Sequence, residues 1–244
     1  MSSSVPANPP RITDPQAVPV HSVDSHLPAV PPALLRLDAI RARFPIPDGW
    51  KPEVAGDGRF SSDQAPASAA VLVPLVRRDD GLHVLLTQRT AHLKNHPGQI
   101  SFPGGKAEPG DADLEATALR EAQEEVGLHR RHVEIVGRLP SYTTVTSFVV
   151  TPVVAFVQPP FDLTPDGREV AEVFEVPLAF LMNPAHHRRH LYHYDGGSRQ
   201  FLSMPWRSGA GAGGSKEFFI WGATASMLRN FYRLLADAPP AGVM

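Results

Sequence analysis

The chain has 244 residues, of which 42% are hydrophobic and 20% charged, and its formal net charge is −2 at pH 7. This composition is typical of a globular protein with a sizeable core, and the charge argues against a broad surface for nucleic acid or membrane. The absence of cysteine excludes disulfides, cysteine metal sites and a cysteine nucleophile. With neither a secretory signal pattern nor an apolar run of about 18 residues, we expect a cytoplasmic protein.

The N-terminal part of the chain carries the weakest structural signals. Residues 1–30 are rich in Pro and Ser and lack periodicity, which predicts a flexible tail. Within residues 31–66, apolar side chains at near-helical spacing predict a short amphipathic helix that ends before Pro45, followed by a loop. We expect the folded domain to cover residues 67–236 and a C-terminal tail to cover residues 237–244.

Strand and helix signals alternate within the expected domain. Strands are predicted over residues 70–76, 82–88, 133–139, 148–157, 170–176 and 218–221. Helices are predicted over residues 113–126 and 222–235, with Gly127 ending the first of them. Asp79-Asp80-Gly81 predicts a hairpin between the first two strands. Residues 183–216 are expected to be irregular, apart from a hairpin around Asp195-Gly196-Gly197.

Residues 90–110 form the longest interruption between predicted elements. They are dense in Pro and Gly, including the adjacent pair Gly104 and Gly105. This density predicts a long loop, and a long loop inside a compact domain usually has a function.

Three acidic residues lie on the predicted helix that follows this loop. Glu121, Glu124 and Glu125 occupy positions i, i+3 and i+4, so they project from one helical face. Their mutual repulsion destabilises a helix by a few tenths of a kcal/mol per pair, and a divalent cation would reverse that effect. Carboxylate oxygens suit Mg²⁺ or Mn²⁺. By itself, however, this spacing is more typical of a solvated acidic face.

The surroundings of the acids favour a metal site. Arg120 is adjacent to them and can hold a carboxylate in place through an ion pair. Leu119, Ala122 and Val126 provide an apolar face for burial, while the glycine pair upstream lets backbone approach a metal or phosphate closely. A solvated helix would need none of these features together.

The segment from Gly105 to Leu128 resembles the Nudix box. That pattern is Gly, five residues, Glu, seven residues, Arg-Glu, an aliphatic residue, any residue, Glu-Glu, any residue, Gly and an aliphatic residue. Here Asp111 stands in place of the first Glu, and eight residues separate it from Arg120. The segment from Arg120 to Glu125 is intact, whereas the role of Asp111 stays open.

A second stretch is similar to the signature of the coenzyme A pyrophosphatase branch of the Nudix family. It runs from Leu85-Leu86-Thr87 to Phe102-Pro103-Gly104-Gly105. Thr90 replaces a Ser of that signature and Lys94 replaces an Arg. The resemblance covers roughly residues 68–235.

This resemblance implies a fold and an activity. The fold would be α/β, a Nudix α/β/α sandwich with a mixed β-sheet and a loop–helix–loop catalytic motif. The enzyme would use Mg²⁺ or Mn²⁺ to hydrolyse the diphosphate of coenzyme A, or of a derivative, to adenosine 3′,5′-bisphosphate and 4′-phosphopantetheine. Alternatives are a Nudix diphosphatase for ADP-ribose, dinucleotides or nucleoside triphosphates, and a non-catalytic Nudix-like binding module. The three acids argue against the binding module.

The resemblance also suggests roles within the box. Glu121 and Glu125 would be the main metal ligands, and Glu124 would share ligation or accept the proton of the attacking water. Arg120 would orient a carboxylate. The carbonyl of Gly104, in the glycine pair at the start of the box, would complete the coordination sphere.

Residues outside the box are weaker candidates. Glu169 or Glu172, near a predicted strand, would act as general base, or both are surface charges. Arg89 and Lys94 would bind substrate phosphates together with Gly104 and Gly105, or would be solvated charges at a strand end. The histidines at 186, 187 and 190 are expected in a solvated loop rather than in a phosphate or metal site.

Overall fold

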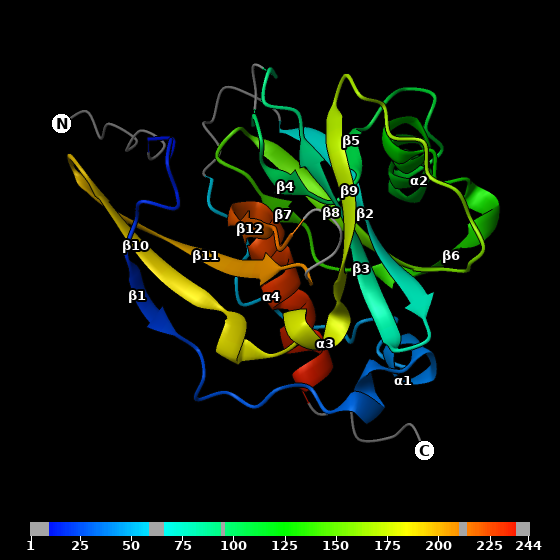
Figure 1. Cartoon of the computed structure of the whole chain (residues 1–244), viewed down its shortest axis with the longest axis horizontal. Coiled ribbons are helices and arrows are strands. Elements are labelled where there is room, and N and C mark those ends of the chain that lie inside the picture. The colour runs from blue at the N-terminus through cyan, green and yellow to red at the C-terminus, as the bar shows by residue number, and fades with distance from the viewer. Residues whose placement is uncertain (1–9, 59–65, 94–95, 210–213, 238–244) are drawn as a thin grey trace.

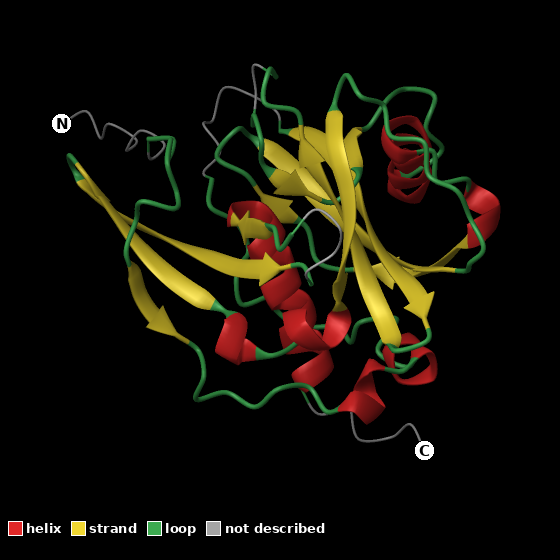
Figure 2. Cartoon of the chain, viewed as in Figure 1, coloured by secondary structure: helices red, strands yellow, loops and turns green. Residues whose placement is uncertain are grey.

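The computed structural model of the chain describes residues 10–58, 66–93, 96–209 and 214–237 (Figure 1). Two β-sheets and two longer helices dominate this described part (Figure 2). Helix α2 (Leu114–Val126) packs on one face of the larger sheet. Helix α4 (Gly222–Ala236) packs against its other face and against the smaller sheet. The described chain is therefore a layered α/β structure, as the sequence predicted.

The larger sheet has eight strands in the described residues and is mixed. Its main order is β4-β3-β2-β8-β6, with β5 and β9 pairing β2 and β3 respectively, and β7 pairing β8. The pair β2–β8 is parallel and the others are antiparallel. The strands are β2 (Ala67–Arg78), β3 (Gly81–Arg89), β4 (Ile100–Ser101), β5 (Gly104–Lys106), β6 (Val133–Arg138), β7 (Tyr142–Thr143), β8 (Phe148–Val157) and β9 (Val170–Pro177).

The smaller sheet is antiparallel, with the order β1-β10-β11-β12. Its strands are β1 (Val20–Val23), β10 (Arg188–Tyr194), β11 (Gly197–Arg207) and β12 (Glu217–Trp221). The remaining helices are short: η1 (Pro32–Leu35), α1 (Leu37–Arg41), η2 (Arg130–His132), α3 (Leu178–Leu181) and η3 (Pro184–His186). Within the described ranges, no helix is both long and apolar enough to cross a membrane.

Local sequence explains where α2 begins and ends. The Asp113 carboxylate accepts a hydrogen bond from the backbone N–H of Ala116 at 2.8 Å and so caps the first turn. Gly127 has φ 71°, a left-handed conformation that glycine adopts without the steric cost of a side chain. Between these residues, Ala118, Ala122 and Val126 are buried against the sheet. The prediction of this helix is confirmed.

Most predicted strands are confirmed, but three segments contain more or different regular structure than expected. The Pro- and Gly-rich loop of residues 90–110 contains β4 and β5, which pair with β3 and β2. Residues 183–216 are not irregular, because the predicted hairpin extends over β10 and β11. The helix expected within 31–66 is divided into η1 and α1 by an extended residue, Arg36.

The expected flexible tail is also corrected. Residues 1–9 lie outside the described residues, but residues 10–30 fold onto the protein. Strand β1 pairs with β10, and Ile12 and Val30 are buried. Prolines disfavour helices and central strands, yet they are compatible with an edge strand whose outer side needs no partner. Of the expected C-terminal tail, residues 238–244 lie outside the described residues.

Candidate active site

The three acids of α2 lie in different environments. The side chains of Glu125 and Glu121 are 7% and 17% exposed, whereas that of Glu124 is 59% exposed. Glu121 and Glu125 lie against β5, because they are on the part of α2 that adjoins the buried face packed on the sheet. Two of the three predicted ligands are therefore held in a largely desolvated position.

The glycine pair of β5 allows these carboxylates to approach the backbone. The backbone N–H of Gly104 donates a hydrogen bond to Glu125 Oε2 at 3.2 Å. Gly104 has φ 158°, and a Cβ atom there would lie 2.4 Å from the carbonyl oxygen of Ala70. At Gly105, a Cβ atom would lie 2.5 Å from a carboxylate oxygen of Glu121. Any side chain at either position would displace the strand or an acid.

Arg120 links the loop to the acidic face. Its Nε and Nη2 donate to the two carboxylate oxygens of Asp111 at 2.9 and 3.1 Å. Its Nη1 donates to Glu121 and to Glu124, both at 2.9 Å. A further hydrogen bond, from Nη2 to the carbonyl oxygen of Lys106 at 3.1 Å, ties the guanidinium to β5. Arg120 therefore bonds three carboxylates at once, those of Asp111, Glu121 and Glu124.

Asp111, whose role the sequence left open, is the anchor of Arg120. Besides the paired hydrogen bonds from Arg120, it accepts hydrogen bonds from the Thr117 hydroxyl and the Glu108 backbone N–H, both at 2.9 Å. The bonds from Arg120 lower the pKa of Asp111 well below its ordinary value and, in return, raise the pKa of Arg120. Asp111 and Arg120 thus form an ion pair with two parallel hydrogen bonds.

The buried acids are electrostatically strained without a cation. Burial raises the pKa of Glu125 to about 7, and the nearby Glu121 and Glu169 carboxylates add to this shift. Burial also raises the pKa of Glu121, with added effects from Glu124 and Glu169. In the described part of the chain, no three acidic or histidine side chains converge as a complete ligand set, and Glu124 is engaged by Arg120. Two desolvated carboxylates with hard oxygens nevertheless fit a hydrated divalent cation such as Mg²⁺, which keeps several waters.

Arg89 and Glu169 lie beside this acidic pair. At the end of β3, the two terminal nitrogens of Arg89 lie 3.7 Å from Glu125 Oε1 and 3.7 Å from Glu169 Oε2. The Nε of Arg89 is buried and has no hydrogen-bond partner among the described residues. The structure thus brings Arg89 and Glu169 together with the acids of α2, whereas Lys94 lies outside the described residues.

Glu172 lies on the other face of the larger sheet. It is the register partner of Gln88, and the Lys216 ammonium forms an ion pair with it and also donates to Gln88 at 2.9 Å. Glu172 and Phe174 are two positions apart on β9 and so point to the same face, on which Phe174 stacks against Phe218 of the core packed on α4. The structure therefore does not bring Glu172 to the acids of α2.

The expectation of a solvated histidine loop was wrong. His187 and His190 are buried, and His186 stacks on Phe180 at 3.9 Å between ring centroids. His187 Nε2 is 2.7 Å from the Leu181 carbonyl oxygen and its Nδ1 is 3.1 Å from Arg229 Nη1. Burial lowers the pKa of His187 to about 4. These histidines lie in or next to β10, whose pairing with β1 and β11 buries part of the segment. Local composition does not reveal this pairing.

Comparisons with known proteins agree with this geometry. The family model described as the NUDIX domain matches residues 66–194. Proteins named "Uncharacterized Nudix hydrolase NudL" from Salmonella paratyphi B and Salmonella newport are each 45% identical to the chain over 164 residues, which cover 66% of this chain and 79% of the relative.

Two solved structures are also similar. One is a binary complex of a C. elegans Ap4A hydrolase, with 23% identity, a TM-score of 0.40 and coverage of 48% of this chain and 85% of that one. The other is a MutT/nudix family protein from Enterococcus faecalis, with 18% identity, a TM-score of 0.43 and coverage of 72% and 65%.

The family model spans more than half of the chain, and it includes β3, the glycine pair and all of α2. The relatives match at an identity well above the range in which only the fold is shared. The chain therefore belongs to the Nudix hydrolases, pyrophosphohydrolases that act on acid anhydrides of phosphorus.

Proposed function

We propose that the chain hydrolyses the diphosphate of coenzyme A or one of its derivatives to adenosine 3′,5′-bisphosphate and 4′-phosphopantetheine. The observation that carries this proposal is the position of the stretch that resembles the coenzyme A branch. Its Arg89 approaches Glu125 to 3.7 Å, and its final residues, Gly104 and Gly105, pack against Glu125 and Glu121. The residues that suggest the substrate therefore adjoin the residues that suggest the chemistry.

In this proposal Glu121 and Glu125 hold a divalent cation, with Glu124 as a third candidate once it leaves Arg120. When bound, Mg²⁺ or Mn²⁺ supplies positive charge to the phosphate oxygens and lowers the pKa of bound water. Arg120 keeps Glu121 in position while it is itself held by Asp111. The Gly104 N–H orients the Glu125 carboxylate, and the Gly104 carbonyl remains a candidate ligand.

The general base is better assigned to Glu169 than to Glu172. Glu169 is half-exposed at the edge of the acidic site, so its carboxylate is accessible to water and lies next to Arg89. Glu172 is neutralised by Lys216 on the opposite face of the sheet. Glu124 is exposed and remains an alternative base.

The site also offers phosphate contacts. The terminal nitrogens of Arg89 are 3.7 Å from two different carboxylates, longer than a direct hydrogen bond. Its guanidinium can therefore turn to a substrate phosphate without breaking a short ion pair. We propose Arg89 as the phosphate ligand, with the backbone of Gly104 and Gly105 beside it and Lys94 as a second cation.

A substrate panel tests this function. Coenzyme A, ADP-ribose and NADH are incubated separately with the protein and Mg²⁺ or Mn²⁺, and products are identified by mass. We expect adenosine 3′,5′-bisphosphate from coenzyme A at the highest kcat/KM. Absence of that product would overturn the coenzyme A assignment, and faster cleavage of ADP-ribose or NADH would replace it with that substrate.

A matched pair of variants tests the site. Glu125→Gln is expected to remove most turnover while the circular dichroism spectrum stays unchanged. Glu115→Gln is the control, because Glu115 lies in the first turn of the same helix and pairs with Arg138 instead. Near-normal turnover in Glu125→Gln would contradict the assignment, as would hydrolysis that is unaffected by EDTA.

The same proposal includes a cytoplasmic location, because a chain without cysteine suits a reducing compartment. Cell fractionation with an antibody to the chain tests this location, and recovery outside the cytoplasmic fraction would contradict it.

A further inference from the structure

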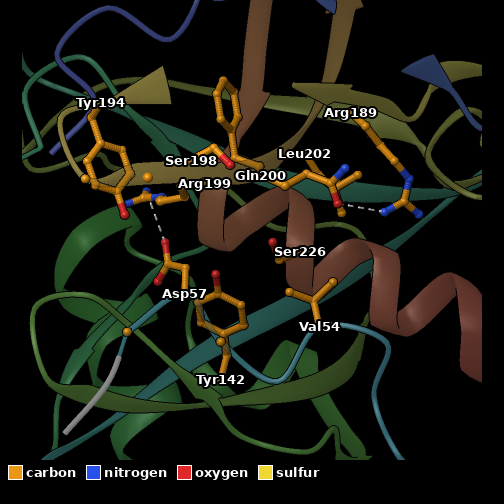
Figure 3. A pocket seen from close by; sticks show the side chains of 16 residues that line it. Val54, Asp57, Tyr142, Arg189, Tyr194, Ser198, Arg199, Gln200, Leu202 and Ser226 are labelled. Atoms are coloured by element: carbon orange, nitrogen blue, oxygen red, sulfur yellow. Dashed lines mark hydrogen bonds and ion pairs between the residues drawn. The ribbon is translucent and has the colours of Figure 1, made fainter. Parts of the chain in front are cut away.

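A cavity of about 530 Å³ lies away from the acids of α2. The loop of residues 54–58, β7, the β10–β11 hairpin and the beginning of α4 form its walls (Figure 3). Tyr142 on β7 belongs to the core on the sheet face opposite α2. Tyr142 on β7 pairs with Val150 on β8, Val150 pairs with Ala69 on β2, and Ala69 pairs with Lys106 on β5. The cavity wall at Tyr142 is therefore three strand spacings, each about 4.8 Å, from the strand that carries Gly104 and Gly105.

An incompletely paired guanidinium lines this cavity. The Arg199 side chain is 10% exposed, and its Nη2 lies 3.3 Å from Asp57 Oδ2. Its Nε and Nη1 are buried and have no hydrogen-bond partner among the described residues. A buried donor without an acceptor costs about 1–3 kcal/mol, and more when it belongs to a charged group. A ligand in the cavity that carries hydrogen-bond acceptors would remove this cost by accepting from Arg199.

Two hydroxyl groups also line the cavity, and they are paired with each other and with Asp57. The Tyr142 hydroxyl, beside Asp57 in the close-up view (Figure 3), donates to the Asp57 carboxylate and accepts from the Ser226 hydroxyl. Helix α4 begins at Gly222, in the wall, and its N-cap residue, Trp221, makes no side-chain capping hydrogen bond in the described structure. The beginning of a 15-residue helix carries partial positive charge and unpaired backbone N–H groups.

The charges of the wall do not oppose an anion. Arg189 also lines the cavity, but Asp24 and Glu53 neutralise it. Asp57 is the remaining acid of the wall, and burial raises its pKa, which eases its protonation beside a negative ligand. With Arg189 neutralised, the net charge of the side chains that line the cavity is therefore zero when Asp57 is ionised and positive when Asp57 is protonated.

We propose that this cavity is an anion-binding site that takes a phosphate group. The edge of the Arg199 guanidinium that carries Nε and Nη1 turns to the oxyanion, and backbone N–H groups at the beginning of α4 donate to its other oxygens. The phosphate belongs either to the distant end of an elongated substrate or to a separate small molecule, and both sources present the same oxygens to Arg199.

Sulfate is the probe, because its charge stays constant over the pH range of interest, and binding is measured by titration calorimetry on the full chain. Arg199→Gln is expected to weaken sulfate binding by on the order of tenfold or more, since a hydrogen bond to a charged group is lost. Arg207→Gln is the matched control, because Arg207 lies on the same strand, is exposed and pairs with Glu217. Unchanged sulfate affinity in a folded Arg199→Gln variant would overturn the proposal.

Asp57→Asn provides a second, independent test with the opposite sign. Asp57 is faced by Arg199 from β11, Tyr142 from β7 and the Val145 N–H, and His96 acts on it electrostatically. Removing its charge is expected to tighten sulfate binding several-fold at neutral pH. In the wild type sulfate affinity should rise as the pH falls and Asp57 becomes protonated, and in Asp57→Asn this rise should be smaller. Weaker sulfate binding in Asp57→Asn than in the wild type would refute the proposal.

Kinetics then distinguish the two sources of phosphate, and only this part of the test rests on the proposed function. A higher KM with unchanged kcat in Arg199→Gln would assign the phosphate to the substrate. An unchanged KM, with inorganic phosphate altering kcat in the wild type but not in Arg199→Gln, would assign it to a separate molecule. Either result supports the anion site. If the wild type does not cleave coenzyme A, the proposed function fails, and the sulfate measurements alone then decide whether the cavity binds an anion.

Discussion

Replacement of Glu125 by Gln is expected to stabilise the metal-free protein at alkaline pH although it removes turnover. Burial raises the pKa of the Glu125 carboxyl to about 7, from 4.5 for an ordinary Glu. Between these two values the folded chain binds more protons at this position than the unfolded chain does. The contribution of Glu125 to stability is therefore present at low pH and is lost as the pH rises through 7.

The magnitude follows from the separation of the two pKa values. At roughly 1.4 kcal/mol per pH unit, the cost of ionising Glu125 in the folded chain approaches about 3 kcal/mol once the pH exceeds 7. A neutral Gln avoids this cost and can still accept the hydrogen bond from the Gly104 N–H. The free energy of unfolding of Glu125→Gln should therefore exceed that of the wild type by up to about 3 kcal/mol at about pH 8, and by less than about 1 kcal/mol at about pH 5.

Urea denaturation in EDTA at these two pH values measures the effect, with Glu115→Gln as the control on the same helix. Addition of Mg²⁺ should reduce the difference at about pH 8, because a cation held by Glu121 and Glu125 stabilises only the folded wild type. A Glu125→Gln variant that is less stable than the wild type at about pH 8 would refute this reasoning. An equal gain at both pH values would show that packing, rather than charge, is responsible.

Three further outcomes are expected. In Arg120→Lys, the single lysine ammonium cannot donate two hydrogen bonds to Asp111 while also holding Glu121. Activity at a limiting metal concentration should therefore fall by roughly 10–100-fold, and an unchanged dependence of activity on metal concentration would contradict this. Glu169→Gln should lower kcat by roughly 10²–10⁴-fold and Glu172→Gln should leave it near normal, and steady-state kinetics showing the reverse order would exchange their roles. Because the pKa of His187 is lowered to about 4 from an ordinary 6.5, its contribution to stability is present above pH 6.5 and is lost as the pH falls towards 4. Urea titrations from neutral to acid pH should show a flatter profile for His187→Gln, and an unchanged profile would rule out this contribution.

Local features of this chain could be predicted because their physical causes are local. Helix α2 follows from the cap at Asp113, the apolar residues at helical spacing and the left-handed Gly127. The acids of α2 share a face for the same reason, since the helical repeat alone places Glu121 beside Glu125. The hairpin at residues 79–81 likewise depends on turn residues that are adjacent in the chain.

Contacts between distant segments required the tertiary structure. The choice between Glu169 and Glu172 depends on the side chains that strand pairing brings beside each of them, Arg89 for Glu169 and Lys216 for Glu172. Arg199 and Asp57 are 142 positions apart in the chain, and no local pattern in the sequence connects them. The sequence alone therefore determined the spacing of the acids on α2 and the resemblance to the Nudix family. Which residues surround that helix, and where the cavity beside Arg199 lies, were decided only when strand pairing brought separate segments together.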